Sequence, residues 1–377
     1  MASTTTLASI LHGPRTLELS PRPLPPLSPS DVLVSVKSTG LCGSDLHYYT
    51  HFRNGDIIVR EPLTLGHESA GVVAEVGSDV TELKVGDRVA LEVGLPCGEC
   101  SLCQEGRYNI CRGMKFRSSA KAVPHAQGTL QEKVVHSARW CWKLPETVPL
   151  ELGALVEPLS VAMHAHDRAS LPPSSTVLIF GAGAVGLLCA AMSKVNKAKR
   201  VIVADIQEDR VKFAVQNGFA DASVVVPMKR PVTIEDKLGF AKQVAEMVKD
   251  VEVDGQPTGE VNAVFECTGV ESCMQASIHA TAPGGKVMII GMGNPIQTLP
   301  ISAASLREVD LLGVFRYANT YPRVIQMLAS KNPLLPDLSK LITQRYSGME
   351  NIPKAFDMAA KVKDEQGNLV IKVMVDM

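Results

Sequence analysis

The stretch Thr176-Val-Leu-Ile-Phe-Gly-Ala-Gly-Ala-Val-Gly186 decides the fold of this chain. Its apolar start is typical of a buried β-strand, and the glycines that follow have the spacing of a phosphate-binding turn that opens a helix. Gly181 permits the tight turn, Gly183 lets the backbone approach a pyrophosphate, and Gly186 lets helix and strand pack closely. The stretch therefore predicts the first strand, turn and helix of a dinucleotide-binding domain.

The residues after this turn continue the alternation of strand and helix patterns. Buried-strand runs recur at 201–204, 263–266 and 286–290, separated by helical patterns that include an expected exposed helix at 233–249 and a loop at 254–259. This alternation predicts an α/β fold with a doubly wound parallel sheet.

Asp205 ends the second strand, where its carboxylate can accept hydrogen bonds from both ribose hydroxyls and would repel a 2′-phosphate. NAD is therefore favoured over NADP. Arg210 either flanks the adenine or lies in solvent on its helix, and the residues alone leave both interpretations open.

The part of the chain before this domain is β-rich. Strand patterns at 31–37, 70–76 and 87–92 alternate with turns rather than helices, and the proline-rich run 21–29 indicates a loop. After about residue 308, a strand at 310–314 and two amphipathic segments close the chain. Periodicity alone does not assign them to either domain.

Composition excludes several classes of protein. The 377 residues suffice for two hydrophobic cores. The 38 Lys+Arg are balanced by 39 Asp+Glu, so the chain lacks the excess of positive charge that binds the phosphate backbone of nucleic acid. Segment 177–192 is uncharged, but its glycines and the following Lys194 argue against a membrane span. The first residues lack the layout of a signal peptide, and no peroxisomal tripeptide ends the chain, so we expect a cytoplasmic protein.

Four of the nine cysteines crowd into one short segment: Cys97, Cys100, Cys103 and Cys111. Pro96, Gly98 and Gly106 place them on a loop that can wrap around a single ion. Four thiolates at this spacing suit a closed tetrahedral zinc site, which leaves no position for substrate. We expect this site to be structural.

A second set of metal-ligand types is dispersed along the chain, at Cys42, His67, Glu68 and Glu157. Each residue has an ordinary explanation as well, since buried cysteines are common, His67 could be a core histidine, and Glu157 before a proline could cap a helix. Spacing alone does not decide whether they share an ion.

Several motifs occur in one order along nearly the whole chain: Gly40-Leu-Cys-Gly-Ser-Asp45, Gly66-His-Glu68, the four-cysteine lobe, Glu157-Pro-Leu-Ser-Val161 and Gly181-Ala-Gly-Ala-Val-Gly186. In this order they resemble the zinc-dependent medium-chain dehydrogenases. Val314-Phe-Arg-Tyr317, and a glutamate at 157 where classical alcohol dehydrogenases carry a cysteine, resemble the branch of sorbitol dehydrogenases and their fungal xylitol and arabinitol relatives.

This resemblance implies a GroES-like catalytic domain over residues 1–165, with the structural zinc lobe at 95–113. It also implies a Rossmann NAD-binding domain at 166–308 and a C-terminal part, 309–377, that returns to the catalytic domain. Two zinc ions per chain and a homotetramer are expected as well.

The resemblance also assigns roles at the reaction centre. Cys42, His67 and Glu68 would hold the catalytic zinc directly, while Glu157 would hold a water at the ion, and the two carboxylates can exchange roles. Asp45 would orient His67. Ser44 would accept the substrate proton and His47 would pass it on, although a turn hydroxyl and a surface histidine are the plainer interpretations.

The expected activity is NAD-dependent oxidation of a polyol, D-sorbitol first and xylitol next, to the ketose. Residues expected to contact the polyol are Ser44, Tyr48, Phe116, Glu157, Arg316 and Tyr317. Residues expected to contact NAD, besides the turn glycines, Asp205 and Arg210, are Val185, Ile290, Gly291, Phe315 and Arg316. Packing aromatics and a solvated arginine are the alternatives for the polyol set.

The identity of the polyol stays open, because Ile58 lies in a loop where related enzymes vary. L-arabinitol and galactitol are alternative substrates. A threonine or simple alcohol dehydrogenase, and a zinc- and NAD-binding protein without turnover, are the competing functions.

Overall fold

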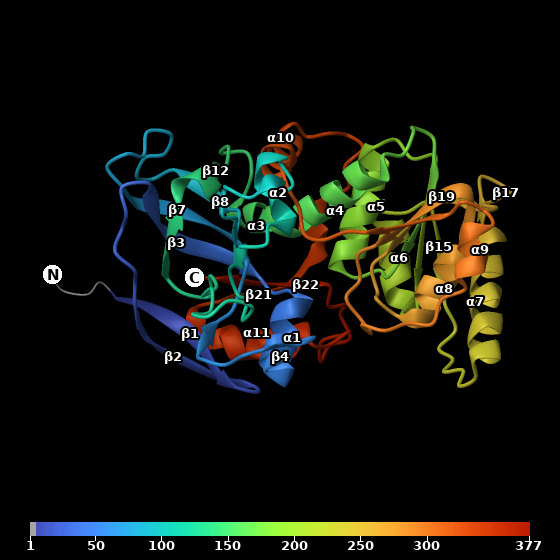
Figure 1. Cartoon of the computed structure of the whole chain (residues 1–377), viewed down its shortest axis with the longest axis horizontal. Coiled ribbons are helices and arrows are strands. Elements are labelled where there is room, and N and C mark those ends of the chain that lie inside the picture. The colour runs from blue at the N-terminus through green and yellow to red at the C-terminus, as the bar shows by residue number, and fades with distance from the viewer. Residues whose placement is uncertain (1–4) are drawn as a thin grey trace. The chain divides into compact units, whose positions relative to one another are not determined.

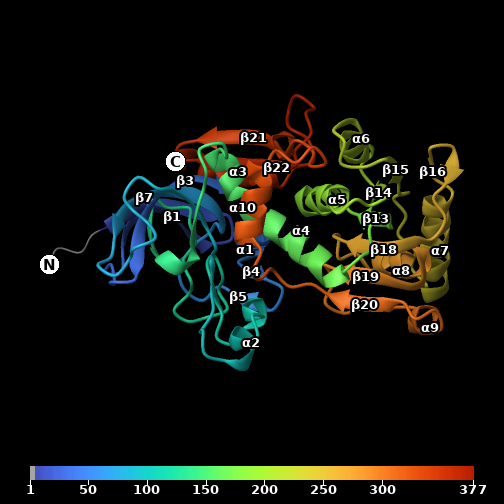
Figure 2. The ribbon, with the colours of Figure 1, turned by 90° about the horizontal axis from the view of Figure 1, so that it is seen from above.

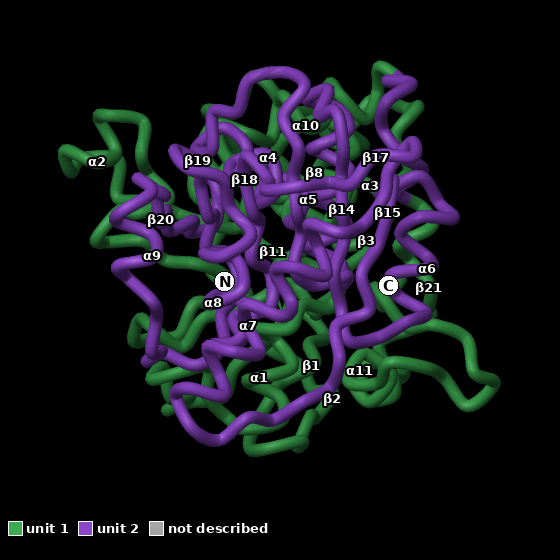
Figure 3. Tube along the Cα trace, turned by 90° about the vertical axis from the view of Figure 1, so that its right-hand side faces the viewer, with its two compact units in different colours: residues 1–157, 318–330, 339–377 green, residues 158–317, 331–338 purple. Residues whose placement is uncertain are grey.

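The computed structural model describes residues 5–377, which form two compact units (Figures 1 and 3). The first unit comprises the chain up to residue 157 together with 318–330 and 339–377, and the second comprises 158–317 and 331–338. The first four residues, part of the opening that lacks a signal-peptide layout, lie outside the described residues. Between residues 5 and 377, no helix combines the length and apolar character needed to cross a bilayer.

The second unit is built on a six-stranded sheet in the order β15-β14-β13-β18-β19-β20, in which every pair is parallel. Figure 2 shows α5 and α6 on one face of this sheet and α7 and α8 on the other. The bounds are β13 Thr176–Phe180, α5 Ala184–Val195, β14 Arg200–Asp205, α6 Glu208–Gln216, β15 Ala222–Val225, α7 Ile234–Lys249, β18 Val261–Glu266, α8 Glu271–Ala280, β19 Thr281–Ile289, α9 Ile301–Ser305 and β20 Asp310–Gly313. The predicted doubly wound α/β fold is confirmed.

Two details of this unit differ from expectation. Helix α7 begins after Thr233, whose Oγ1 accepts the N–H of Asp236 at 3.1 Å, but the helix is not simply exposed. Its apolar face, including Phe240 and Val244, packs into the core beside Phe180. The predicted loop at 254–259 contains the turn of a short hairpin, β16 Glu252–Val253 with β17 Gln256–Pro257.

The first unit is dominated by a seven-stranded sheet in the order β12-β8-β7-β3-β22-β21, with β11 also paired to β3. The bounds are β3 Asp31–Gly40, β7 Glu68–Val76, β8 Arg88–Leu91, β11 Lys133–Ser137, β12 Cys141–Lys143, β21 Ile342–Ser347 and β22 Lys372–Asp376. A second sheet joins β2 Thr16–Pro23, β1 Thr5–Gly13 and β6 Leu63–Thr64, while β4 Arg53–Asn54 with β5 Ile57–Ile58 and β9 Gly94–Leu95 with β10 Lys115–Phe116 form hairpins.

The expectation that turns alone separate these strands is wrong in one place. Helix α1, Gly43–His51, follows β3 directly, and Asp45 in its first turn accepts the backbone N–H of Cys42 at 3.4 Å. Tyr48 and Tyr49 pack its inner face into the core. The remaining helices of this unit are α2 Ser101–Gln104, α3 Leu150–Ala154, the start of α4 Val156–Ala169, α10 Tyr321–Ala329 and α11 Ile352–Ala359.

Strand pairing brings three distant segments together at one end of the large sheet. Gly40 at the end of β3 lies opposite Glu68 at the start of β7 on one side and opposite Met374 of β22 on the other. The C-terminal strand therefore belongs to the sheet of the first unit, and it lies beside the residues that the sequence singled out as metal ligands.

Candidate metal centres and dinucleotide turn

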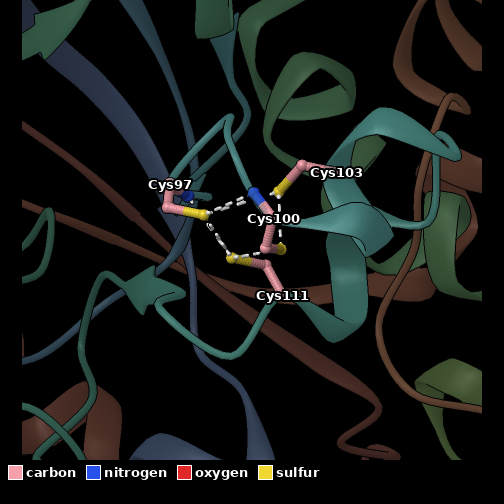
Figure 4. A group of neighbouring side chains, drawn as sticks. All are labelled: Cys97, Cys100, Cys103 and Cys111. Atoms are coloured by element: carbon pink, nitrogen blue, oxygen red, sulfur yellow. Dashed lines mark hydrogen bonds between the residues drawn. The ribbon is translucent and has the colours of Figure 1, made fainter.

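Within residues 5–377, two groups of Cys, His and carboxylate side chains come close enough to hold an ion. In the first group, Cys97 lies just after β9, Cys100 is the N-cap of α2, Cys103 lies within α2, and Cys111 follows a turn of 3₁₀ helix at Tyr108–Ile110. Figure 4 shows the four sulfurs converging on one point. None of the four forms a disulfide.

The sulfur positions match a tetrahedral metal site. The Sγ–Sγ distances are 3.5 Å for Cys97–Cys111 and Cys100–Cys103, and 3.9 Å for Cys97–Cys103 and Cys100–Cys111. Zn–S bonds of about 2.3 Å in a tetrahedron require sulfurs roughly 3.8 Å apart. Four thiolates at these distances therefore fit a zinc ion without rearrangement.

The thiols of this group titrate in opposite directions. Hydrogen bonds from backbone N–H groups, first that of Cys100, lower the pKa of Cys97 to about 6. Burial and the neighbouring thiols raise the pKa of Cys103 to about 12. Sulfurs this close cannot all carry negative charge unless a cation balances them, which is the condition that a bound zinc ion meets.

The second group joins Cys42, His67 and Glu68, whose ligand atoms all lie within 4.8 Å of one another. Cys42 immediately precedes α1, and Glu68 begins β7. His67 and Glu68 are buried, while Cys42 is half-buried. A thiol, an imidazole and a carboxylate around one point form the mixed donor set of a catalytic zinc site, in which three protein ligands leave a fourth position open.

Asp45 fixes the orientation of the His67 ring. Its Oδ1 lies 3.2 Å from His67 Nδ1, and the same oxygen accepts the Ser118 hydroxyl at 2.6 Å and the Gly66 N–H at 3.2 Å. A carboxylate only accepts, so Nδ1 carries the proton and Nε2 is left as the ligand atom. Burial opposes the charged ring, but Asp45 and Cys42 outweigh it and raise the pKa of His67 well above its ordinary value.

Lys372 is a residue of this centre that the sequence reasoning missed. Its Nζ donates to both carboxylate oxygens of Glu68, at 2.8 and 2.7 Å, and to the carbonyl of Leu41 at 3.1 Å. Lys372 is 4% exposed. Burial alone would lower the pKa of Lys372, but the charge of Glu68 raises it. A charged residue inside the apolar run 370–375 was the available signal, because a buried lysine requires a partner.

The remaining predicted residues of the first unit lie on α1, α4 and β10. Ser44 is half-buried and His47 exposed, three positions apart on α1. Glu157, buried on α4, lies close enough to Lys372 to help raise the pKa of that ammonium, but outside the group of three ligands. The Phe116 ring lies 5.6 Å from the ring of His67. Tyr48 is 3% exposed and packs in the core, where its hydroxyl accepts the Ala120 N–H at 3.3 Å.

The glycine-rich turn of the second unit has the geometry of an anion-binding site. Gly181 has φ of 96°, and a Cβ on Gly186 would collide with the carbonyl oxygen of Gly181. Asp205 accepts the N–H of Ala182 at 2.7 Å and that of Gln207 at 2.8 Å, so its carboxylate lies directly at the turn. The first N–H groups of a helix have no intrahelical partner and attract anions, so the start of α5 suits a pyrophosphate.

Other predicted cofactor residues lie in the same unit. The Arg210 guanidinium lies 4.0 Å from where a Cβ on Gly183 would stand, and Val185 is half-buried in the first turn of α5. The N–H groups of Ile290 and Gly291 both donate to the carbonyl of Glu266, at 3.0 and 2.9 Å.

Arg316 and its neighbours lie at the end of the longer stretch of the second unit, residues 158–317. Arg316 has φ of 51°, and its guanidinium stacks over the half-exposed ring of Phe315 at 4.7 Å. Tyr317 is 3% exposed. These residues belong to the second unit, whereas the metal-ligand types belong to the first.

Two family models match successive parts of this chain. Residues 28–146 match the family model of the alcohol dehydrogenase GroES-like domain, and residues 184–330 match that of zinc-binding dehydrogenases. The chain is 40% identical to a sorbitol dehydrogenase of Arabidopsis thaliana, over 98% of this chain and 95% of that protein. It is 41% identical to a probable D-xylulose reductase A of Emericella nidulans, over 86% of each. The solved structure of L-idonate 5-dehydrogenase from Escherichia coli aligns over 100% of this chain and 99% of that one, with a TM-score of 0.85 and 25% identity.

Proposed function

This chain belongs to the zinc-binding dehydrogenase family, in the branch of the sorbitol dehydrogenases, and from that premise we propose that it oxidises a secondary hydroxyl of a polyol to a ketone. Its cofactors are NAD and zinc. The observation that carries the proposal is the convergence of Cys42, His67 and Glu68 within 4.8 Å, in a chain that also holds a dinucleotide turn. We propose D-sorbitol as the substrate, with xylitol next and L-arabinitol or galactitol as alternatives.

The chain's own residues supply binding and proton transfer. Cys42, His67 and a carboxylate would hold a zinc ion, which would supply the Lewis acidity that lowers the pKa of a bound hydroxyl, and the glycine turn would hold NAD, which would supply a hydride acceptor. Ser44, at the start of α1, accepts the hydroxyl proton, and His47, one turn further and exposed, passes it to solvent. Asp45 keeps Nε2 of His67 available as a ligand atom throughout.

Recognition of the polyol depends on donors placed beyond the reacting carbon. A guanidinium presents several N–H groups in a rigid fork, which suits hydroxyls on consecutive carbons, and we assign this role to Arg316 beside Tyr317. Tyr48 and Phe116 line the polyol site in this proposal. A small-molecule polyol is the partner, and we further propose a homotetramer in the cytoplasm.

We expect sorbitol and xylitol to be oxidised with a higher kcat/KM than ethanol and 2-butanol, which have no second hydroxyl for Arg316 to bind. An unpaired buried donor costs about 1–3 kcal/mol, so each lost contact should lower efficiency roughly 5- to 150-fold. Steady-state kinetics with NAD on sorbitol, xylitol, L-arabinitol, galactitol and both simple alcohols measures these kcat/KM values.

Arg316→Ala should lower kcat/KM for sorbitol. Arg230→Ala, which removes an exposed arginine of the same unit, should leave it unchanged. Better turnover of simple alcohols by the unmodified protein would replace the polyol assignment with a general alcohol dehydrogenase.

Cofactor choice should depend on Asp205. Asp205→Ala removes a charged acceptor from the ribose site, so we expect kcat/KM for NAD to fall roughly 10- to 100-fold and that for NADP to change less. Kinetics with both cofactors at saturating polyol measure the preference. Glu208→Ala, which removes an exposed carboxylate on the neighbouring helix, is the matched control. Equal efficiency of NAD and NADP with the unmodified protein would contradict the assignment.

The purified protein should contain about two zinc ions per chain, one for each group of ligands. Elemental analysis after dialysis measures the total. Cys100→Ser should lower the zinc content by one ion per chain, because it removes a ligand from the four-cysteine lobe. A stable content near one in fully active protein would contradict the two-site model.

A further inference from the structure

The segment through which the chain returns to the first unit is attached to the four-cysteine lobe. Asn319 donates its backbone N–H to the Tyr108 hydroxyl at 2.7 Å, and its Nδ2 donates to the carbonyl of Gly106 at 2.8 Å. Both partners lie between Cys103 and Cys111. Asn319 stands three residues after Arg316, in the part of the chain that follows the second unit directly.

The Tyr108 hydroxyl is oriented for this contact. It donates its own proton to Glu92 Oε1 at 2.7 Å, and Glu92 Oε2 accepts the Trp142 indole N–H at 2.7 Å. Glu92 is 1% exposed, so this carboxylate is held rigidly inside the unit. With its proton committed to Glu92, the hydroxyl oxygen is available to accept the N–H of Asn319.

The position of Gly106 and Tyr108 depends on the cysteines at either end of their loop. Between Cys97 and Cys111 the chain forms only the four-residue helix α2 and a three-residue 3₁₀ turn. Such short elements supply little stability of their own, so an ion held by the four sulfurs is what closes this loop.

The attached segment adopts a backbone conformation that requires outside support. Asn319 has φ of 60° and Arg316 has φ of 51°, in the left-handed region that arginine seldom occupies. Residues in such conformations persist when the surrounding structure determines them. Further along, the buried Tyr321 donates its hydroxyl to the carbonyl of Leu91 at 2.9 Å, which holds the other end of the segment.

We propose that the metal-loaded four-cysteine lobe positions the segment 316–319 through Tyr108 and Asn319, and thereby sets the affinity of the enzyme for its polyol. The lobe then does more than stabilise the fold, although neither Tyr108 nor Asn319 is a catalytic residue. Both are positioning residues that act through Arg316. This inference rests on the proposed function for its polyol part, but the attachment itself does not.

Two variants and one control test the proposal in the zinc-loaded enzyme, and a third variant, Cys100→Ser, tests it with the lobe emptied. Tyr108→Phe removes the hydroxyl that accepts the Asn319 N–H, and Asn319→Gly removes the amide bonded to Gly106 while tolerating a positive φ. Tyr346→Phe removes a hydroxyl of the same kind elsewhere in the first unit and serves as the control.

The rate of amide hydrogen exchange over residues 316–321 measures how firmly the segment is held by the lobe. Separate values of KM and kcat for sorbitol measure the effect on polyol affinity. In Tyr108→Phe and Asn319→Gly we expect faster exchange, KM raised about fivefold and kcat within about twofold, with zinc content unchanged. Cys100→Ser should speed exchange in the same segment, because it empties the lobe. Tyr346→Phe should match the unmodified protein.

Unchanged exchange in both Tyr108→Phe and Asn319→Gly would overturn the attachment. Faster exchange with unchanged KM would overturn its role in polyol affinity. If the unmodified protein oxidises no polyol at all, the proposed function fails, while the exchange measurements still decide whether the lobe holds the segment.

Discussion

Cys42→Ser should lower kcat for polyol oxidation by roughly 1000-fold or more while the protein stays folded. Cys42 contributes the only sulfur to the group that it forms with His67 and Glu68 in the described chain. Serine is a poor zinc ligand at neutral pH because its hydroxyl does not ionise there. The Lewis acidity of a bound metal contributes several kcal/mol to transition-state stabilisation, so its loss removes most of the rate.

The measurement pairs kinetics with zinc analysis and thermal unfolding. The variant should keep the zinc of the four-cysteine lobe and a Tm close to that of the unmodified protein. Cys141→Ser is the matched control, since Cys141 is a buried cysteine of the same unit that lies outside both ligand groups. Turnover within tenfold of the unmodified enzyme, together with an intact zinc content, would show that Cys42 is not a ligand.

Lys372→Met should lower the free energy of unfolding by about 3–5 kcal/mol. Lys372 and Glu68 form an ion pair whose side chains are 4% and 1% exposed. Removing the ammonium leaves a buried carboxylate whose charge is no longer balanced by its nearest cation. The cost comes from that stranded charge, because an intact buried ion pair contributes little by itself.

Urea unfolding of the metal-stripped protein measures this effect. Adding Glu68→Gln to Lys372→Met should recover much of the lost stability, since an amide is far cheaper to bury than an unpaired carboxylate. Lys143→Met, which breaks the more exposed pair with Asp87, should change stability much less. A Lys372→Met protein as stable as the unmodified one would mean that Glu68 is neutral or paired elsewhere.

The pair also bears on how the two carboxylates divide their roles. Both oxygens of Glu68 already accept hydrogen bonds from Lys372, and Glu157 lies near enough to influence the same ammonium. Lys372 thus links the ligand group of the first 157 residues to the last strand of the chain. Loss of β22 would remove the counter-charge of Glu68 as well as a strand of the sheet.

Local patterns were enough to predict the nucleotide-binding half of the protein. The strand predicted at 176–180 is β13, Thr176–Phe180. The strand predicted at 310–314 is β20, Asp310–Gly313, but periodicity assigned it to neither domain and the resemblance placed it in the part that returns to the first, whereas it pairs with β19 in the sheet of the second unit. The spacing of the four cysteines likewise predicted a compact group of sulfurs. These features are readable because each depends on residues only a few positions apart, whose backbone geometry is set by glycine, strand propensity and burial.

Helix α1 could not be predicted from local sequence patterns. Its nine residues are too short and too polar to give a clear helical period, and the helix is stabilised instead by Asp45 in its first turn and by Tyr48 and Tyr49 packing into the core. The same Asp45 also orients His67, so one carboxylate serves the helix and the metal centre. The periodicity of hydrophobic residues carries no information about the two partners of the Asp45 side chain.

By itself, then, the sequence determined the doubly wound α/β domain, the glycine turn with Asp205, the cysteine lobe and the list of candidate ligands. Only the tertiary structure decided that Lys372 neutralises Glu68, 304 positions away, and that Asn319 bonds to Tyr108 across 211 positions. The physical reason is that a buried charge or a strained backbone is stable only beside a specific partner. Which partner is available depends on strand pairing between segments that share no local pattern.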